Sequence, residues 1–183
     1  MIIIDLVSIL VTYLFVYFCR KLYAQHHRNT CKAQVGVTEA GLHVNHKIPF
    51  LGTSVDGVVD CPTCGLGIVE IKCPYGTKQN KWRNMTVTNC CTDSNFCCEL
   101  DSSNNISLKK NHSYYYQIIG QMALTSAKYC DFVVYTRKGI NVQRVIFDKV
   151  FWLEMQPKLV MFYRHMVAEI MSSRILRGKL LYP

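Results

Sequence analysis

The segment 49–76 limits the fold more than any other part of this chain, because two runs rich in β-branched residues flank a turn of glycine, proline and cysteine. The first run carries Asp56, and the second carries Glu70 and Lys72. Alternate side chains of a β-strand share a face. We therefore expect Glu70 and Lys72 to project from one face of the second strand, while the apolar residues next to them line a core.

An aspartate brought up beside this glutamate and lysine makes a site for a divalent metal ion with a cation next to it. Carboxylates and a backbone carbonyl suit a hard ion such as Mg²⁺. Such an ion can activate a water molecule and stabilise the charge that develops on a phosphate. The alternative interpretation is a half-buried hairpin with a surface ion pair, since an isolated Glu-x-Lys is a common tripeptide.

Four stretches of the chain, in this order and spacing, resemble the Asp…Glu-x-Lys nuclease superfamily and, within it, the YqaJ-type viral recombinases, which are relatives of phage lambda exonuclease. They are 49–57 (PFLGTSVDG), 69–75 (VEIKCPY), 114–122 (YYYQIIGQM) and 130–136 (CDFVVYT). The resemblance covers residues 20–174. It implies an α/β domain with a restriction-endonuclease-like mixed sheet flanked by helices. It also implies an exonuclease that degrades one strand at duplex DNA ends for recombination, for example in a mobile element.

The resemblance assigns roles to individual residues. Asp56, Glu70 and the backbone carbonyl of Ile71 would bind Mg²⁺, for which Mn²⁺ could substitute. Lys72 would serve the attacking water, and Gln117, on a helix predicted over 114–126, would orient that water or the phosphate.

Charge points to the partner. The chain has 183 residues, which fits one domain, and its formal charge of +9 favours a polyanion. Such a partner is nucleic acid or an anionic membrane surface. The resemblance implies the ends of double-stranded DNA as the partner, and it also implies a homo-oligomer. The polar segment 77–113 is expected to be an irregular excursion whose lysines are available to phosphates. The expected DNA contacts are Lys78, Lys81, Lys109, Lys110 and Gln121.

The first nineteen residues are apolar, with Asp5 as their only charge, and they look foreign to the resembled family. We therefore divide the chain into a segment 1–19 and an exonuclease-like domain 20–183, which should fold without it. The segment is near the lower length limit for a membrane-spanning helix, and a misassigned start is the other interpretation. The family's N-terminal acid would fall near 15–18 and is missing, so one alternative to an active enzyme is a catalytically weak DNA-binding remnant. The other alternative is a membrane-tethered basic protein whose hairpin is only structural.

Localisation follows the same division. A nuclease-like domain predicts an intracellular protein, in the nucleus or the cytoplasm. If residues 1–19 span a membrane, the basic residues that follow predict a single-pass protein with a cytoplasmic body.

The chain contains ten cysteines. Cys61 and Cys64 form a Cys-x-x-Cys pair, which by spacing is half a zinc site. No histidine pair at zinc-finger spacing follows, and the adjacent cysteines at 90–91 and 97–98 would chelate awkwardly. We therefore favour a tight turn with free thiols over a structural zinc ion.

The remaining patterns predict further strands and helices, the last of which is a long helix. Pro157 is expected to kink the last helix or to end it at Gln156. In chain order the predicted elements are a strand over 35–44 interrupted at 39–41, a strand over 51–60, the strand that carries Glu70 and Lys72, a helix over 114–126, strands over 131–136 and 142–147, and a helix over 148–174.

Overall fold

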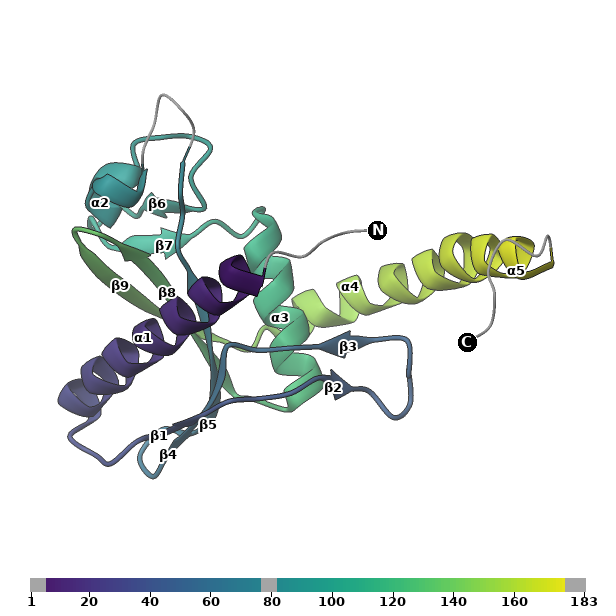
Figure 1. The fold of residues 1–183 in the computed structure, drawn as a ribbon, viewed down its shortest axis with the longest axis horizontal. Helices are drawn as coiled ribbons and strands as arrows, with labels where there is room; N and C mark the ends of the chain where they lie inside the picture. Colours follow the sequence, from purple (N-terminus) through teal and green to yellow (C-terminus); the bar gives the residue numbers. More distant parts are fainter. Residues whose placement is uncertain (1–5, 77–81, 177–183) are drawn as a thin grey trace.

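A computed structural model describes residues 6–76 and 82–176, which are organised around a five-stranded sheet (Figure 1). The strand order is β1-β4-β5-β8-β9, in which β5 and β8 are parallel and the other neighbours are antiparallel. The predicted mixed sheet is therefore confirmed. Its strands are β1 (Gly36–Thr38), β4 (Gly57–Cys61), β5 (Gly65–Lys72), β8 (Tyr129–Thr136) and β9 (Gly139–Ile146).

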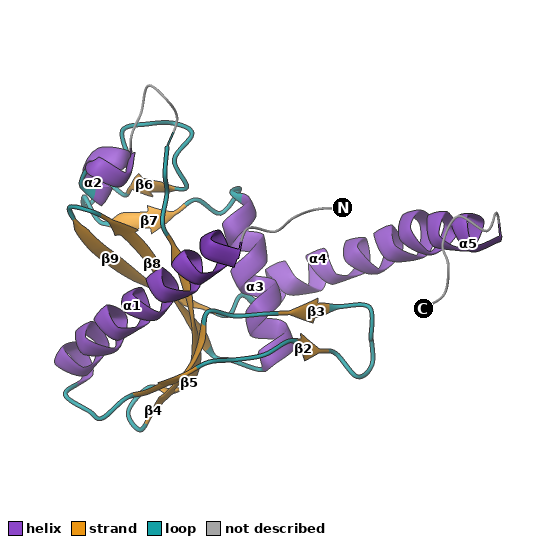
Figure 2. Cartoon of the chain, in the orientation of Figure 1, coloured by secondary structure: helices purple, strands orange, loops and turns teal. Residues whose placement is uncertain are grey.

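Helices cover both faces of this sheet (Figure 2). The first long helix, α1, packs on one face, and α3 packs on the other. The helices are α1 (Leu6–Cys31), α2 (Val87–Cys90), α3 (Ser113–Thr125), α4 (Lys149–Phe162) and α5 (Ala168–Leu176), with a short 3-10 helix η1 (Trp82–Asn84) and a π-helix η2 (Tyr163–Val167). The predicted arrangement of a sheet flanked by helices is confirmed.

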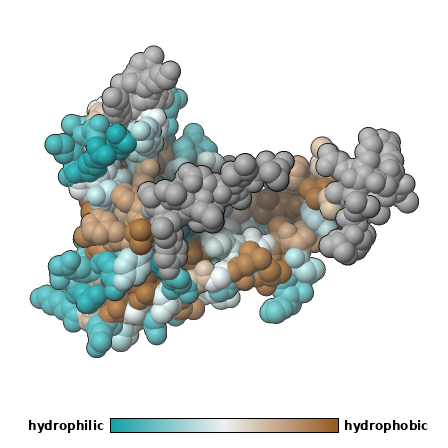
Figure 3. Space-filling view, in the orientation of Figure 1, coloured by the Kyte–Doolittle hydropathy of each residue, from teal (hydrophilic) through white to brown (hydrophobic). Residues whose placement is uncertain are grey.

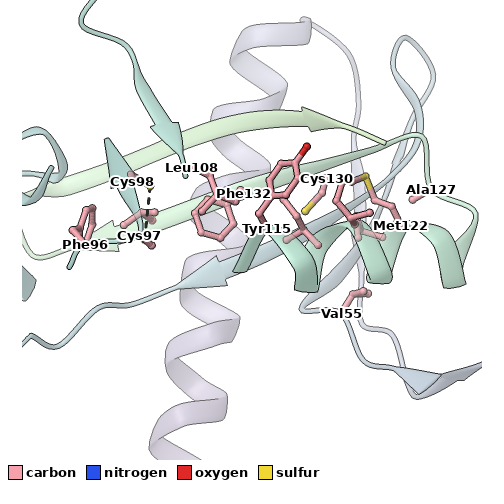
Figure 4. Packing of buried hydrophobic residues seen from close by; sticks show 14 of the residues in the cluster. Val55, Phe96, Cys97, Cys98, Leu108, Tyr115, Met122, Ala127, Cys130 and Phe132 are labelled. Atoms are coloured by element: carbon pink, nitrogen blue, oxygen red, sulfur yellow. Dashed lines mark hydrogen bonds between the residues drawn. The ribbon is translucent and has the colours of Figure 1, made fainter. Parts of the chain in front are cut away.

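The period-two pattern of β5 explains why two separate cores form. Val69 and Ile71 point toward α1 and pack with its Tyr23. Ile68 points the other way and packs with Ile118 of α3. Figure 4 shows this second core, in which strand and helix side chains interdigitate. Because Glu70 and Lys72 have the parity of Ile68, they lie on the α3 side of the sheet.

Two small hairpins complete the strands. β2 (His43–Val44) pairs with β3 (Gly52–Thr53), and β6 (Cys98–Leu100) pairs with β7 (Ile106–Leu108). The interruption predicted at 39–41 is confirmed, whereas the strand predicted over 51–60 is divided, because residues 54–56 leave the ladder. The segment 82–113 is more regular than predicted, since it contains α2 and the β6–β7 hairpin and buries Phe96.

The C-terminal helices form an arm that projects from the sheet (Figure 1). Pro157 lies inside α4, which continues to Phe162, so a break at Gln156 is wrong. Apolar side chains stay exposed along this arm, where brown patches are visible in Figure 3. They include Leu153, Phe162 and Met166.

Helix α1 crosses the boundary that the sequence placed between residues 19 and 20. Cys19 is 1% exposed and packs in the α1-side core, and the ring of Phe15 meets that of Tyr135 edge-on at 5.2 Å between centroids. Part of the segment 1–19 therefore packs against the sheet. No helix within the described residues has both the length and the apolar character needed to cross a membrane.

Gly67 in β5 leaves almost no room for a side chain. A Cβ at this position would lie 2.3 Å from Cζ of Tyr129, a ring that is 2% exposed. We expect Gly67→Ala to lower the free energy of unfolding by about 1–3 kcal/mol, because overpacking forces a buried ring to move. Denaturant unfolding measures this loss. Gly36→Ala is the matched control, since its Cβ would find its nearest neighbour at 3.9 Å, and equal losses for both variants would contradict the prediction.

Candidate active site

The β4–β5 hairpin brings the two predicted carboxylates together. Asp56 directly precedes β4, and its Oδ2 accepts a hydrogen bond of 2.7 Å from the backbone N–H of Ile71 on β5. Gly57 permits this close approach, since a Cβ there would lie 3.0 Å from Val69 Cγ1. The backbone bond fixes Asp56 beside the strand that carries Glu70.

Glu70 is held by polar side chains from both β5 and α3. It is 4% exposed. Its Oε1 accepts hydrogen bonds from Lys72 Nζ at 2.6 Å and from Gln117 Nε2 at 2.8 Å. Its Oε2 accepts one from Gln121 Nε2 at 2.8 Å. The two glutamines are one helical turn apart on α3, so both hydrogen bonds to the carboxylate come from a single helix face.

Lys72 completes a triangle with Glu70 and Gln117. Besides its bond to Glu70, its Nζ donates to Gln117 Oε1 at 3.0 Å. The ammonium group also lies 4.4 Å from the ring centroid of Tyr114, at the start of α3. Two hydrogen-bond acceptors and one aromatic ring therefore hold a lysine head group that keeps 17% side-chain exposure.

The electrostatics of this triangle favour a bound cation. Burial raises the pKa of the Glu70 carboxyl, and the nearby charge of Asp56 raises this pKa further, against the opposing effect of Lys72. Two carboxylates that repel each other at the end of a buried strand are stabilised by a positive ion between them. Oxygen donors of this kind fit a hard divalent cation, so the residues present suit the metal that the sequence implied.

The predicted DNA contacts are distributed unevenly. Burial lowers the pKa of His112 most, and the charges of Lys109 and Lys72 lower this pKa further. Both cations therefore lie near that ring. Lys109 Nζ donates to the Ser94 carbonyl at 2.7 Å. Lys110 Nζ lies farther along, 6.0 Å from the ring centroid of Tyr115.

Two predicted DNA contacts, Lys78 and Lys81, lie outside the described residues. The expectation that Gln121 contacts DNA needs a correction. Gln121 is only 2% exposed, and its amide nitrogen donates hydrogen bonds to Glu70 and to the Ser54 carbonyl. It therefore positions Glu70 rather than contacting DNA. The sequence pattern placed both glutamines on one helix face but could not tell which of them lay deeper.

Two features of the site were not predicted. Tyr114 packs under Lys72, and its place three residues before Gln117 is the only pattern that could have indicated it. The second is the approach of α1, whose Cys19 thiol shares a hydrogen bond with the free thiol of Cys73 and lies within electrostatic range of Asp56. An open groove of about 390 Å³ also adjoins the site, lined by Tyr116, Gln117 and Trp152 among others.

The comparisons with known proteins agree with this geometry. Residues 18–128, more than half of the chain, match the family model of the YqaJ-like viral recombinase domain. Among solved structures, the chain is similar to an alkaline exonuclease, LHK-Exo from Laribacter hongkongensis. The identity is 25% and the TM-score 0.58, over 88% of this chain and 72% of that one.

The complex of LHK-Exo with dAMP is similar at the same identity and TM-score, over 88% of this chain and 71% of that one. Among curated protein sequences, none matches significantly. The match to the family model, the sheet with its helices and the Asp56–Glu70–Lys72 constellation together lead to one conclusion. The chain belongs to the family of the YqaJ-like viral recombinase domain.

Proposed function

We propose that this protein is a metal-dependent DNA exonuclease that hydrolyses phosphodiester bonds at duplex ends in the course of recombination. The observation that carries the proposal is the convergence of Asp56, Glu70, Lys72 and Gln117 at one end of the β4–β5 hairpin. The similarity to an alkaline exonuclease supports the same reading.

Each residue has a separate task in this proposal. Asp56, Glu70 and the Ile71 carbonyl hold Mg²⁺, which Mn²⁺ can replace; when bound, the ion supplies Lewis-acid stabilisation of the phosphate charge. Gln121 and the backbone N–H of Ile71 keep the two carboxylates oriented. Lys72 positions the attacking water and offsets the negative charge on the phosphoryl oxygens, while Gln117 holds the lysine head group in place.

DNA reaches this centre from the α3 side. The groove beside Gln117 presents the aromatic rings of Tyr116 and Trp152, which suit a base at the strand end. Lys109 adds positive charge near Lys72. We place the enzyme in the nucleus or the cytoplasm, where DNA is accessible, and we propose a homo-oligomer, which the exposed apolar side chains of the C-terminal arm support.

Removal of divalent metal ions is expected to abolish cleavage of an end-labelled linear duplex, and Mg²⁺ should restore it. Ca²⁺ should support DNA binding without cleavage, because it is larger and looser in its coordination. A covalently closed circular duplex is the control, since an enzyme that needs a DNA end leaves it intact. Full activity in excess chelator, or equal degradation of the closed circle, would contradict the proposal.

A catalytically weak DNA-binding remnant is the second candidate. The resembled family has an N-terminal acid that is expected near residues 15–18. In α1, the residues from Leu14 to Cys31 include no aspartate or glutamate, although Cys19 of this helix lies near Asp56. This candidate predicts salt-sensitive binding of duplex DNA with no release of nucleotides under any divalent metal ion. Nucleotide release from the linear duplex, measured at protein excess, separates the two candidates.

A further inference from the structure

A second group of metal-binding side chains lies at the other end of the β4–β5 hairpin, on the α1 side of the sheet. It consists of His27, Cys31, Cys61 and Cys64, whose ligand atoms all lie within 4.8 Å of one another. Cys61 ends β4, and Cys64 lies in the turn before β5. His27 and Cys31 are one helical turn apart on α1, so the helix presents both to the hairpin turn.

The four ligand atoms lie close to the separations found in zinc sites. In a tetrahedral site with Zn–S bonds of about 2.3 Å and Zn–N bonds of about 2.0–2.1 Å, the ligand atoms lie about 3.5–3.8 Å apart. Here the Sγ atoms of Cys31 and Cys64 are 3.2 Å apart, and the backbone N–H of Cys64 donates to Cys61 Sγ at 3.4 Å. Shifts of about 1 Å or less would place all four atoms on one ion.

The surroundings of His27 supply an independent observation. The ring is 3% exposed, and its Nδ1 lies 3.2 Å from Asp131 Oδ2 and 2.9 Å from the Tyr23 hydroxyl. Its Nε2 is buried and has no hydrogen-bond partner among the described residues. Histidines that bind metals usually direct their other ring nitrogen to a carboxylate. The ring is therefore oriented as a ligand whose Nε2 is left for the ion.

We propose that His27, Cys31, Cys61 and Cys64 bind one Zn²⁺ ion as a structural site. Three thiolates and one imidazole are a common zinc ligand set, and four protein ligands leave no open position for catalysis. The site lies roughly 20 Å along β5 from Glu70, given six residues at about 3.3 Å each. It ties the C-terminal end of α1 to the turn of the hairpin whose open end carries the nuclease carboxylates.

A disulfide between Cys31 and Cys64 is the competing use of these side chains. It would leave Cys61 and the buried Nε2 of His27 without a role, whereas a metal ion uses all four groups. A zinc site that joined Cys61 and Cys64 to the later cysteines, which the sequence disfavoured, is excluded by position. Cys90, Cys97 and Cys98 belong to the α3-side core, while Cys61 belongs to the α1-side core.

The test measures the metal content of the full chain, purified with reductant and reconstituted with zinc. We expect about one Zn²⁺ per chain, retained through gel filtration. Cobalt substituted for zinc should show thiolate-to-metal charge-transfer bands and the visible bands of tetrahedral Co²⁺. Cys64→Ser should lose most of the zinc, whereas Cys91→Ser, which changes a half-buried thiol elsewhere, should retain it. Asp56→Asn should also retain zinc, which separates this site from the nuclease centre.

If Cys64→Ser does not fold, alkylation of the parent protein decides instead. Zinc should protect three thiols from alkylation, and mass spectrometry should map them to Cys31, Cys61 and Cys64. The proposal is overturned if the reduced parent protein takes up no stoichiometric zinc. It is also overturned if the protected thiols lie elsewhere, or if Cys64→Ser and His27→Ala both keep the metal. Because none of these measurements uses DNA cleavage, failure here is distinct from failure of the nuclease assignment.

Discussion

Replacing Lys72 by alanine is expected to slow single-turnover cleavage of a linear duplex by about 10²–10³-fold, which corresponds to about 3–4 kcal/mol of barrier. The reason is that the proposed mechanism places the Lys72 ammonium group, which Glu70 and Gln117 hold, beside the phosphate on which charge develops. If Lys72 formed only a partly exposed ion pair, its loss would change stability by about 0–1 kcal/mol and nothing else. DNA binding in Ca²⁺ should fall far less than the rate, because the other cations remain.

Two further variants make this comparison specific. Lys138→Ala removes the same charge from the exposed β8–β9 turn and should cleave like the parent protein. Lys72→Arg should not restore the rate, because a guanidinium group is planar, bulkier and cannot deprotonate. Circular dichroism must show each variant folded. If Lys72→Ala cleaves DNA at the rate of the parent protein, the assignment of the nuclease centre to this hairpin is wrong.

The sequence predicted the hairpin well because its structure depends on local alternation. Side chains two residues apart share a face, so the placement of Glu70 and Lys72 opposite Val69 and Ile71 needed no knowledge of the rest of the fold. The core packing of Val69 and Ile71 confirms that placement. The carboxylates of the candidate site were predictable for the same reason, since β4 and β5 are neighbours along the chain.

The zinc ligands could not be found in this way. Cys31 and Cys64 are 33 positions apart, and only the packing of α1 on the sheet brings them together. The other two ligands, His27 and Cys31, precede the Cys-x-x-Cys pair in the chain instead of following it. The spacing of His27 and Cys31, four residues apart, was the local pattern that could have indicated a pair of ligands on a helix.

The apolar first residues were ambiguous for a different physical reason. A helix that is apolar over much of its surface can be buried in a membrane or packed in a core, and hydropathy alone does not separate these cases. The structure places Cys19 against β5 and leaves Phe18 about half exposed, at 49%. A truncation at residue 20 would therefore remove Cys19 and part of the α1-side core.

Asp131→Ala is expected to destabilise the fold most among the substitutions outside the candidate active site. Asp131 is 2% exposed, and its carboxylate accepts hydrogen bonds of 2.8 Å from both Nε and Nη2 of Arg144. It also accepts one of 2.5 Å from the Tyr23 hydroxyl and faces the ring of His27. A single carboxylate on β8 thus joins its neighbour β9 to helix α1.

Loss of this carboxylate leaves buried donors without an acceptor. Breaking a buried ion pair by removing one partner costs about 3–5 kcal/mol. We expect the lower end of that range, because the Arg144 side chain is 35% exposed and can turn toward water. For a domain of this size, each kcal/mol lowers the melting temperature by about 2–4 °C.

Denaturant unfolding in zinc-free, reducing buffer measures this loss separately from any metal binding. Asp60→Ala, which removes an exposed carboxylate from β4 of the same sheet, is the matched control and should stay within about 0.5 kcal/mol of the parent protein. Asp131→Asn should fall between the two, because an amide oxygen can still accept from Tyr23 but carries no charge for Arg144. If Asp131→Ala unfolds at the same denaturant concentration as Asp60→Ala, then α1 is held to the sheet by apolar packing alone, and the polar cluster around Asp131 contributes no stability.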